Sequence, residues 1–264
     1  MEIFLVGGDA RSRWVADYFR REGVLFSSCG IDTDAPLPPQ FSCLVLPFPA
    51  RSALAGRQET LIEHCGAGTV VIGGLLDPCA DAMRARGVRV FDLNGSEPLT
   101  TENAVPTAEG AIALALTHSP VTLDASRCLV IGYGRIGKAL AQRLQALHAD
   151  VTVSARKEAD MALAQAMGFR AIRTGHWDAS LARYDFIFNT VPAEVLTRED
   201  LSVLRPDCLL LELASRSGFS PKTCGELGLM SIAASGLPGK FSPKTAGYLY
   251  ARAVLSLMKK EGAL

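Results

Sequence analysis

Short apolar runs alternate with helix-like segments from the start of the chain. In the first hundred residues the runs that predict strands are Ile3–Val6, Val24–Ser28, Cys43–Leu46, Thr69–Ile72 and Val88–Phe91. Segments between these runs, such as Ser12–Glu22 and Cys79–Arg86, have helical spacing and polar faces. This alternation predicts βαβ units and therefore a parallel sheet.

The same rhythm begins again at Arg127. Further strand-like runs are Cys128–Gly132, Asp150–Ser154, Phe169–Ile172, Asp185–Asn189, Cys208–Leu213 and Leu229–Ala233, with a helical pattern at Arg135–Leu147 after the first of them. We therefore predict a second parallel α/β domain of the Rossmann type.

Two further helical patterns complete the organisation. An Ala- and Leu-rich helix ends at about Thr117, and Pro106 is expected in its first turn. After Gly236–Gly239, the segment from Lys244 to Lys260 has one apolar helical face and no sheet left to extend. We predict an α/β protein with two doubly wound parallel-sheet domains, residues 1–120 and 121–239, and a C-terminal helix (243–264) that returns to the first.

Composition removes several classes of function. Lys plus Arg and Asp plus Glu each total 27, so the net charge is zero and nucleic acid is not an expected partner. No apolar run approaches the roughly 18 residues of a membrane helix, and the first residues lack the basic flank of a signal peptide, which predicts a cytoplasmic protein. The 7 cysteines form no CxxC pair and the 4 histidines show no ligand spacing, so no metal site is expected.

The clearest motif is a glycine-rich turn between a strand and a helix. Its residues are Gly132, Tyr133, Gly134, Arg135, Ile136 and Gly137, which fit GxGxxG. In a dinucleotide site the first glycine permits the tight turn, the second admits the pyrophosphate and the third allows close helix packing. Because the motif follows an apolar strand and opens an amphipathic helix, it predicts dinucleotide binding.

The end of the next strand favours NADP over NAD. An acid that binds the ribose 2′-hydroxyl is expected there, but the chain has Ser154, Ala155, Arg156 and Lys157. Arg156 is suited to a 2′-phosphate, with Ser154 and Lys157 assisting. The alternative is a solvated basic loop in which Glu158 supplies the acid after a small shift in register.

Polar groups that follow other strands are candidate ligands, because doubly wound sheets bind ligands at the carboxyl ends of their strands. Asn189, Val191 and Pro192 are expected to border the cofactor. Arg216 is a candidate for an anionic substrate, or else a surface residue. Asp9 and Arg11, after Gly8, either meet a carboxylate or cap a helix.

The remaining candidates lie at helix starts. Lys244 and Thr245 precede the last helix, where an anion is favoured. Glu109 is a candidate general base, or else a cap of its own helix. Asn103 and Thr107 lie in the same segment as Glu109.

These motifs together resemble the A subunits of bacterial dipicolinate synthases. The resemblance runs in order over essentially the whole chain, and it is carried by Gly7–Arg11, Asn103–Gly110, Gly132–Gly137, Ala214–Arg216, Gly236–Gly239 and Pro243–Gly247. The Pro106–Gly110 and Gly236–Gly247 stretches are the most specific. Ser12, Ser217 and Phe219 depart from the family pattern.

The resemblance implies an enzyme of sporulation that oxidises a dihydrodipicolinate, derived from 4-hydroxy-tetrahydrodipicolinate, to dipicolinate with NADP. It also implies a partner, the flavoprotein-like B subunit of such synthases, and we expect a homo-oligomer in the mother-cell cytoplasm. In the resulting hypothesis Arg11, Arg216 and Lys244 bind the two substrate carboxylates. Asn103 and Thr107 hold the ring, and Glu109 accepts a proton.

Two alternatives remain open at this point. One is a relative of D-2-hydroxyacid or alanine dehydrogenases, against which stands the lack of a histidine after the late strands. The other is a non-catalytic NADP-binding scaffold for a flavoprotein. Turnover by the isolated chain separates them, because a scaffold binds NADP and leaves substrate unchanged.

Overall fold

The computed structural model describes residues 2–31, 41–50, 58–76, 79–177 and 179–262. The chain divides into two compact units: unit 1 is Met1–Asn103 with Pro238–Leu264, and unit 2 is Ala104–Leu237. The first boundary therefore falls inside a helix, whereas the sequence pattern placed it after that helix, at residue 120.

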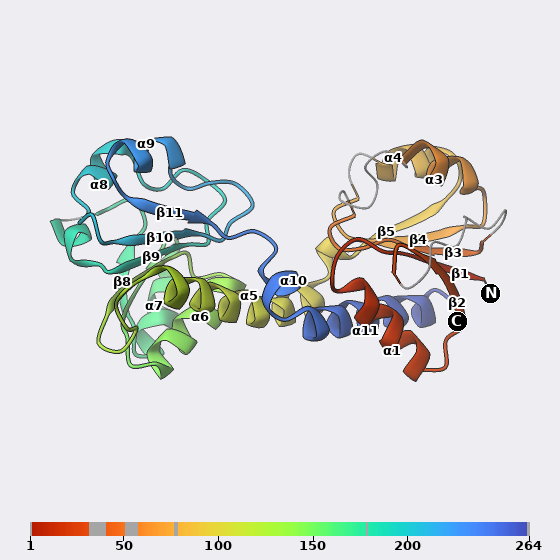
Figure 1. Ribbon diagram of the computed structural model, residues 1–264, viewed down its shortest axis with the longest axis horizontal. Helices are drawn as coiled ribbons and strands as arrows, with labels where there is room; N and C mark the ends of the chain where they lie inside the picture. The colour runs from red at the N-terminus through yellow and green to blue at the C-terminus, as the bar shows by residue number, and fades with distance from the viewer. Residues whose placement is uncertain (1, 32–40, 51–57, 77–78, 178, 263–264) are drawn as a thin grey trace. The chain divides into compact units, whose positions relative to one another are not determined.

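Unit 1 contains a five-stranded parallel sheet in the order β2-β1-β3-β4-β5. The strands are β1 (Ile3–Val6), β2 (Phe26–Cys29), β3 (Cys43–Val45), β4 (Val70–Gly73) and β5 (Arg89–Asp92). Helices α1 (Ser12–Arg21) and α11 (Pro243–Lys260) cover one face, and α3 (Gln58–His64) and α4 (Cys79–Ala85) cover the other (Figure 1). The return of α11 to this unit confirms the predicted course of the chain.

Alternation along β1 shows why both faces of this sheet are covered. Ile3 and Leu5 belong to a buried cluster with residues of α1 and α11, whereas Phe4 and Val6 belong to a cluster with residues of α3 and α4. A parallel strand that is buried on both faces reads as a continuous apolar run, which is the signal that predicted it.

Unit 2 contains a six-stranded parallel sheet in the order β11-β10-β9-β6-β7-β8. The strands are β6 (Arg127–Ile131), β7 (Asp150–Ala155), β8 (Arg170–Arg173), β9 (Phe186–Asn189), β10 (Leu209–Glu212) and β11 (Met230–Ala233). The helices of this unit include α6 (Arg135–Ala146), α7 (Glu158–Ala166), α8 (Arg198–Ser202) and α9 (Pro221–Glu226). Short helices also occur in connections along the whole chain: η1 (Leu93–Gly95), η2 (Ala179–Arg183) and α10 (Leu237–Phe241). This strand order is that of the Rossmann fold, as predicted.

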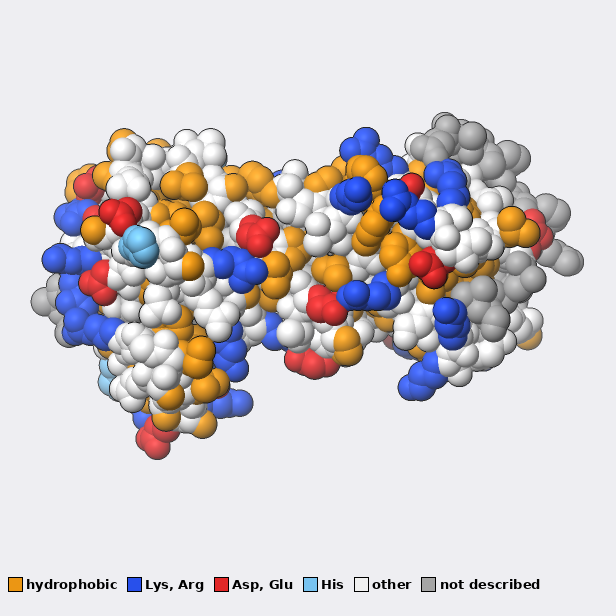
Figure 2. Space-filling model, turned by 90° about the horizontal axis from the view of Figure 1, so that it is seen from below, with side chains coloured by type: hydrophobic (Ala, Val, Ile, Leu, Met, Phe, Trp, Pro, Cys, Tyr) orange, Lys and Arg blue, Asp and Glu red, His pale blue; other side chains and the backbone are white. Residues whose placement is uncertain are grey.

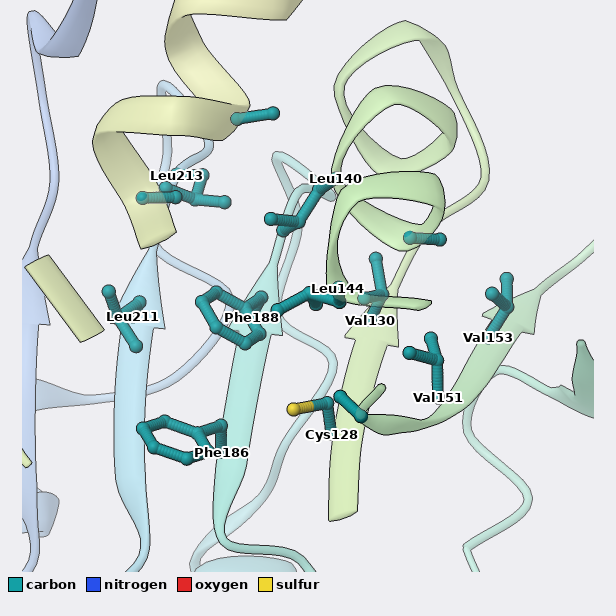
Figure 3. Close-up of a cluster of buried hydrophobic side chains, with 14 of the residues drawn as sticks. Cys128, Val130, Leu140, Leu144, Val151, Val153, Phe186, Phe188, Leu211 and Leu213 are labelled. Carbon is teal, nitrogen blue, oxygen red and sulfur yellow. The ribbon is translucent and has the colours of Figure 1, made fainter. Parts of the chain in front are cut away.

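The core of unit 2 lies between its sheet and α6. Figure 3 shows Phe186 and Phe188 of β9 beside Cys128 and Val130 of β6, with Leu140 from the helix above them. The intervening residues of the same strands pack on the opposite face. Burial of this central strand pair, from Cys128 and Phe186 onward, fixes the position of the turn that follows β6.

The helix α5 (Glu97–His118) begins nine residues earlier than Pro106, so this proline lies inside the helix and not in its first turn. Pro98, near the actual start, takes the first-turn position that the sequence pattern assigned to Pro106. A proline within a helix removes the N–H that would bond to the carbonyl four residues earlier. The polar run from Thr100 to Asn103 hid this earlier start.

Candidate functional site

The glycine turn between β6 and α6 has the geometry that a dinucleotide requires. Gly132 has a φ of +97°, and a Cβ there would lie 2.5 Å from Thr190 Oγ1. A Cβ on Gly137 would lie 2.0 Å from the carbonyl oxygen of Gly132, so the helix start packs directly on the turn. A Cβ on Gly134, in contrast, would meet no atom within 4 Å. The first and third glycines make the turn, and the second leaves an open approach to the backbone.

The first turn of α6 is open to an anion. Gly134 is the N-cap, it makes no side-chain capping bond, and the first turn holds no acidic residue. Tyr133 is 5% exposed and packs on Phe169, and Ile136 packs on the same core, so both anchor the turn while Arg135 is exposed. Free N–H groups and the helix dipole at such a start favour a phosphate.

The loop after β9 closes the other side of the turn. Thr190 donates from its backbone N–H and its hydroxyl to the Ile131 carbonyl, at 2.9 and 2.8 Å. Val191 lies at the same turn, because a Cβ on Gly132 would come within 2.9 Å of its Cγ2. Pro192 is exposed. These contacts place the predicted loop at the switch point of the sheet, between β6 and β9, where doubly wound folds bind ligands.

The end of β7 carries two exposed cations, Arg156 and Lys157, and one buried hydroxyl, Ser154. The Ser154 Oγ lies 3.1 Å from the Thr174 Oγ1 and is 0% exposed, so we exclude Ser154 from the predicted phosphate contact. Glu158 binds Arg173 at 3.1 Å, on the side of β8. Arg156 has no ion-pair partner among the described residues and remains available.

The loop after β10 carries Arg216, which is exposed and makes no ion pair within the described part of the chain. Beneath it lies Glu212, the last residue of β10, which is 7% exposed. The Asn189 side chain, predicted to border the cofactor, instead donates to the Glu212 carboxylate at 2.9 Å. Glu212 was not predicted from the sequence because it reads as the end of an apolar strand, and only its polarity there gave a signal.

Unit 1 has its own pocket at the carboxyl ends of β1 and β3, the switch point of its sheet. The cavity has a volume of about 20 Å³, room for about one water molecule. Its lining combines apolar residues with Asp9, Arg11, Ser12, Asn103 and Tyr250. Three residues predicted to bind substrate, Asp9, Arg11 and Asn103, therefore lie in one pocket.

An ion pair forms part of the lining of this pocket. Arg11 Nη2 lies 2.6 Å from Asp9 Oδ2, and the Arg11 side chain is 11% exposed. Burial raises the pKa of Asp9, but hydrogen bonds from the Arg11 side chain and backbone outweigh that effect, so the pKa lies below its ordinary value. Tyr250, at the base, donates to the Leu46 carbonyl at 2.5 Å, and burial raises its pKa. Arg11 is thus held by an ionised partner.

Lys244 and Thr245 lie at the start of α11, outside the pocket lining, and both are exposed. The Lys244 Nζ lies 5.2 Å from the ring centroid of Trp14 and 5.7 Å from that of Tyr248. Figure 2 shows such a face of unit 1, with Lys and Arg side chains beside hydrophobic ones. The structure does not join Lys244 to the pocket, and cation–π contact explains its position.

Glu109 and Thr107 lie on the part of α5 that belongs to unit 2. The Glu109 Oε1 lies 3.3 Å from the Arg143 Nε on α6. Arg143 is eight residues beyond the start of α6, about 12 Å along the helix axis from the glycine turn. This pair connects two helices, and we do not retain the predicted general-base role of Glu109. Thr107 is 9% exposed and lies one turn after Asn103.

Comparison with known proteins assigns both the nucleotide-binding unit and the whole chain. Residues 106–212 match the model of the NAD-binding domain of D-isomer-specific 2-hydroxyacid dehydrogenases. Over 246 residues the chain is 33% identical to the A subunit of dipicolinate synthase from Bacillus subtilis (strain 168), covering 87% of this chain and 81% of that protein. The chain belongs to the family of dipicolinate synthase A subunits.

Solved structures of the same family share the whole fold. The A subunit of dipicolinate synthase from Bacillus halodurans matches over 97% of both chains at 25% identity, with a TM-score of 0.87. The match to the corresponding structure from Bacillus subtilis includes 100% of this chain and 97% of that chain, at 27% identity and a TM-score of 0.85. The family assignment supports an NAD(P)-dependent oxidoreductase with a nicotinamide dinucleotide as cofactor.

The glycines of the family's specific motifs gather around Arg11. A Cβ on Gly239 would lie 3.1 Å from both the Arg11 Nε and the Asp9 Oδ2, and a Cβ on Gly247 would lie 2.7 Å from the Arg11 carbonyl oxygen. Gly8 donates its N–H to the Ser12 Oγ at 2.9 Å, so the serine that departs from the family pattern caps the same turn. The resemblance therefore marks a packed site around one arginine.

Other kinds of site find no support in the described residues. No group of three potential metal ligands comes together there, and none of the helices described has the length and apolar character of a membrane span. All seven cysteines are buried and none forms a disulfide. Burial raises the pKa of the Cys65 thiol to about 11, which disfavours the reactive thiolate.

Proposed function

We propose that this chain oxidises dihydrodipicolinate, formed from 4-hydroxy-tetrahydrodipicolinate, to dipicolinate with NADP as the acceptor. The observation that carries the proposal is the open glycine turn at the switch point of unit 2, in a chain of this family. Gly134 leaves its backbone uncovered, and α6 begins without a side-chain cap. These features fit a pyrophosphate.

The preference for NADP rests on the end of β7. Arg156 and Lys157 are exposed there, and Arg156 has no ion-pair partner among the described residues. Glu158, the alternative ligand for a ribose hydroxyl, is engaged by Arg173. An unpaired guanidinium binds a phosphate by charge-assisted hydrogen bonds. We therefore assign Arg156 to the 2′-phosphate, with Lys157 beside it.

The substrate is a dicarboxylate, so its binding needs cations. Arg216 lies on the loop that follows β10, at the carboxyl edge of the dinucleotide-binding sheet, and we assign it to a substrate carboxylate. In unit 1, Arg11 is a second proposed carboxylate ligand and Asn103 a proposed ring contact, because both lie at the carboxyl ends of β1 and β3, the switch point of that unit's sheet. The bound nicotinamide supplies the oxidising power, and aromatisation of the product favours the reaction. The side chains need mainly to bind and orient the substrate.

The family's designation as an A component implies a second component. We propose that the chain works with a flavoprotein-like B subunit, forms a homo-oligomer, and acts in the mother-cell cytoplasm of a spore-forming bacterium. The neutral net charge of the chain gives no reason to invoke nucleic acid.

The deciding experiment follows absorbance at the nicotinamide band. The purified chain, with and without the flavoprotein-like partner, is mixed with NADP and freshly generated 4-hydroxy-tetrahydrodipicolinate. Reduction of NADP together with formation of dipicolinate is expected. Binding of NADP without reduction under either condition would favour the scaffold hypothesis instead. Turnover of a D-2-hydroxyacid in its place would favour the dehydrogenase alternative, although the loops after β9 and β10 contain no histidine.

Arg216→Ala tests the substrate assignment. Loss of one charge-assisted contact is expected to raise the substrate KM by about 10-fold to 100-fold, while the Kd of NADP changes by less than about threefold. Arg198→Ala is the matched control, because it removes an exposed arginine of the same unit that pairs with Glu226 at 2.5 Å. Equal effects on substrate and NADP would refute the role of Arg216.

A further inference from the structure

A single buried carboxylate joins the two loops that border the dinucleotide turn. Glu212 uses both of its oxygens: Oε1 accepts from Asn189 Nδ2 and the Ala214 N–H, each at 2.9 Å. Oε2 accepts from the Gly218 N–H at 2.7 Å and from Asn189 Nδ2 at 3.0 Å. Ser217 Oγ lies 3.3 Å from Oε2, but its single proton is shared with the Phe219 carbonyl, which lies closer at 2.6 Å. Among the described residues no cation pairs with this carboxylate, so neutral donors alone hold it.

The first of these loops is closed at both ends by Glu212. The N–H groups of Ala214 and Gly218 both bind its carboxylate, and Arg216 is the middle residue between them. Gly218 is required for this closure, because a Cβ there would lie 2.3 Å from Asn189 Nδ2. The backbone that carries the exposed arginine is therefore held across its base.

The second loop, which follows β9, is bonded to Glu212 through Asn189, a side chain that is 0% exposed. Its Nδ2 also donates to the Val191 carbonyl at 2.9 Å, and its Oδ1 accepts the Val191 N–H at 3.0 Å. Val191 in turn lies against Gly132, the first glycine of the dinucleotide turn. Glu212 thus connects the Arg216 loop to the turn that holds the cofactor.

We propose that Glu212 is a positioning residue, whose carboxylate sets the place of Arg216 relative to the dinucleotide turn. The carboxylate is needed because a glutamine would present an amide donor to at least one of the N–H groups that Glu212 now accepts, which leaves two donors facing each other. The proposal rests on the proposed function only for its kinetic consequence; the closure of the loop is independent of it.

A double-mutant cycle tests this role in the full-length chain. Glu212→Gln alone is expected to raise the substrate KM by about 10-fold or more. The Kd of NADPH is expected to change by about threefold or less, because Thr190 holds the glycine turn through the Ile131 carbonyl independently of Glu212. In an Arg216→Ala background, Glu212→Gln should change the substrate KM by less than about twofold. A full additional loss in that background, or an unchanged KM in the single variant, would overturn the proposal.

A second readout requires no turnover. Trypsin cleaves after Arg216, and release of the loop in Glu212→Gln is expected to speed cleavage at this bond by about 10-fold in native buffer. Equal rates for the two proteins would overturn the proposal even if the chain proved inactive, whereas an inactive chain with faster cleavage would contradict the proposed function alone.

Asp92→Asn is the matched control. Asp92 ends β5 of unit 1 and accepts the N–H groups of Leu75 and Leu76, both at 3.1 Å, so it is also a strand-end carboxylate that holds a loop. The Asp92→Asn variant should unfold at a lower temperature, but its rate of tryptic cleavage after Arg216 and its substrate KM should not change. If Glu212→Gln does not fold, Ser217→Ala removes, from an exposed position, the hydroxyl that Glu212 shares with the Phe219 carbonyl, and it is expected to raise the KM about threefold. An unchanged KM there would count against the proposal.

Discussion

Each sheet has a strand that is followed by a glycine-bearing turn and a helix: β1 and α1 in unit 1, and β6 and α6 in unit 2. The side chains at the two turns differ. After β1, the Asp9 carboxylate accepts the Arg11 N–H at 2.9 Å and also pairs with the Arg11 side chain. After β6, the helix begins at Gly134 with no side-chain cap and no acid in its first turn. Neither α1 nor α6 has a side-chain cap or an acid in its first turn. The difference lies in the preceding turn: the Asp9 carboxylate bonds to the backbone before α1, whereas no carboxylate of the described residues bonds to the backbone of the glycine turn before α6.

This difference shows that the fold alone does not decide what a switch point binds. Both sheets are parallel and both reverse their strand order next to the glycine-bearing strand. In unit 1 the acid repels a further phosphate, but it holds an arginine that suits a small carboxylate. In unit 2 the absence of an acid leaves the helix dipole uncompensated. The choice of side chains within one turn therefore separates a turn that suits a nucleotide phosphate from one that suits a small carboxylate.

The largest expected effect comes from a comparison of two glycines in the open turn. Gly137→Ala places a Cβ against the Gly132 carbonyl, so the turn must shift, and kcat/KM should fall by about 100-fold or more. In Gly134→Ala the added Cβ meets no atom of the protein, so the unfolding temperature should not change. The affinity for the dinucleotide should fall about 10-fold, because the methyl group lies where the phosphate approaches the backbone.

Gly8→Ala is the control in the unit 1 turn and should leave dinucleotide affinity unchanged. Calorimetric titration with NADP and thermal unfolding measure both properties. If Gly134→Ala lost as much thermal stability as Gly137→Ala, the separation between a packing glycine and a ligand-facing glycine would be wrong.

Much of this fold could be predicted because parallel strands that are buried on both faces leave continuous apolar runs. The predicted run at Ile3–Val6 coincides with β1, and the other runs lie within a few residues of their strands. The start of α5 was missed because Pro106 is a common first-turn residue, and the polar segment before it resembles a loop. Nothing in a local pattern reveals that tertiary packing extends a helix through a proline.

The candidate site was also predictable in part: local features followed from the sequence, whereas tertiary contacts did not. The backbone features of the glycine turn follow from residue type, so the sequence located them. The contacts of Glu109 with Arg143 and of Lys244 with Trp14 could not be predicted, because these partners come from other helices and a single sequence does not show which helix faces which. Glu212 was missed because two of its donors are backbone N–H groups, which have no sequence signature, and because Asn189 comes from another strand.

A smaller effect is expected at the end of β7, where we place the 2′-phosphate of NADP. Arg156→Ala should weaken binding of NADP by about 10-fold and leave the affinity for NAD nearly unchanged, since only NADP carries the 2′-phosphate. Arg170→Ala, at the amino end of β8 in the same sheet, removes an equal charge from the opposite edge and serves as the control. Parallel titrations with the two cofactors measure the ratio, and equal losses for both would place Arg156 outside the phosphate site.

The smallest effect concerns the ion pair that distinguishes the turn of unit 1. The pKa of Asp9 lies below its ordinary value of 3.8, so the folded state favours the ionised carboxylate. Such a group stabilises the fold above pH 3.8, and this contribution is lost as the pH falls through the folded-state pKa. The Asp9 side chain is 40% exposed and solvent screens the pair, so the contribution should be less than about 1 kcal/mol.

Asp9→Asn should therefore lower the unfolding temperature slightly at neutral pH. The difference from the unmodified protein should shrink as the pH falls below 3.8 and vanish below the folded-state pKa of Asp9. Asp81→Asn is the control, since its carboxylate pairs with Arg84 at 2.9 Å but is 88% exposed. A difference that grew on acidification would mean that Asp9 is protonated more readily in the folded state. The turn of unit 1 would then not hold a fixed anion, and the contrast with the open turn of unit 2 would lose its electrostatic basis.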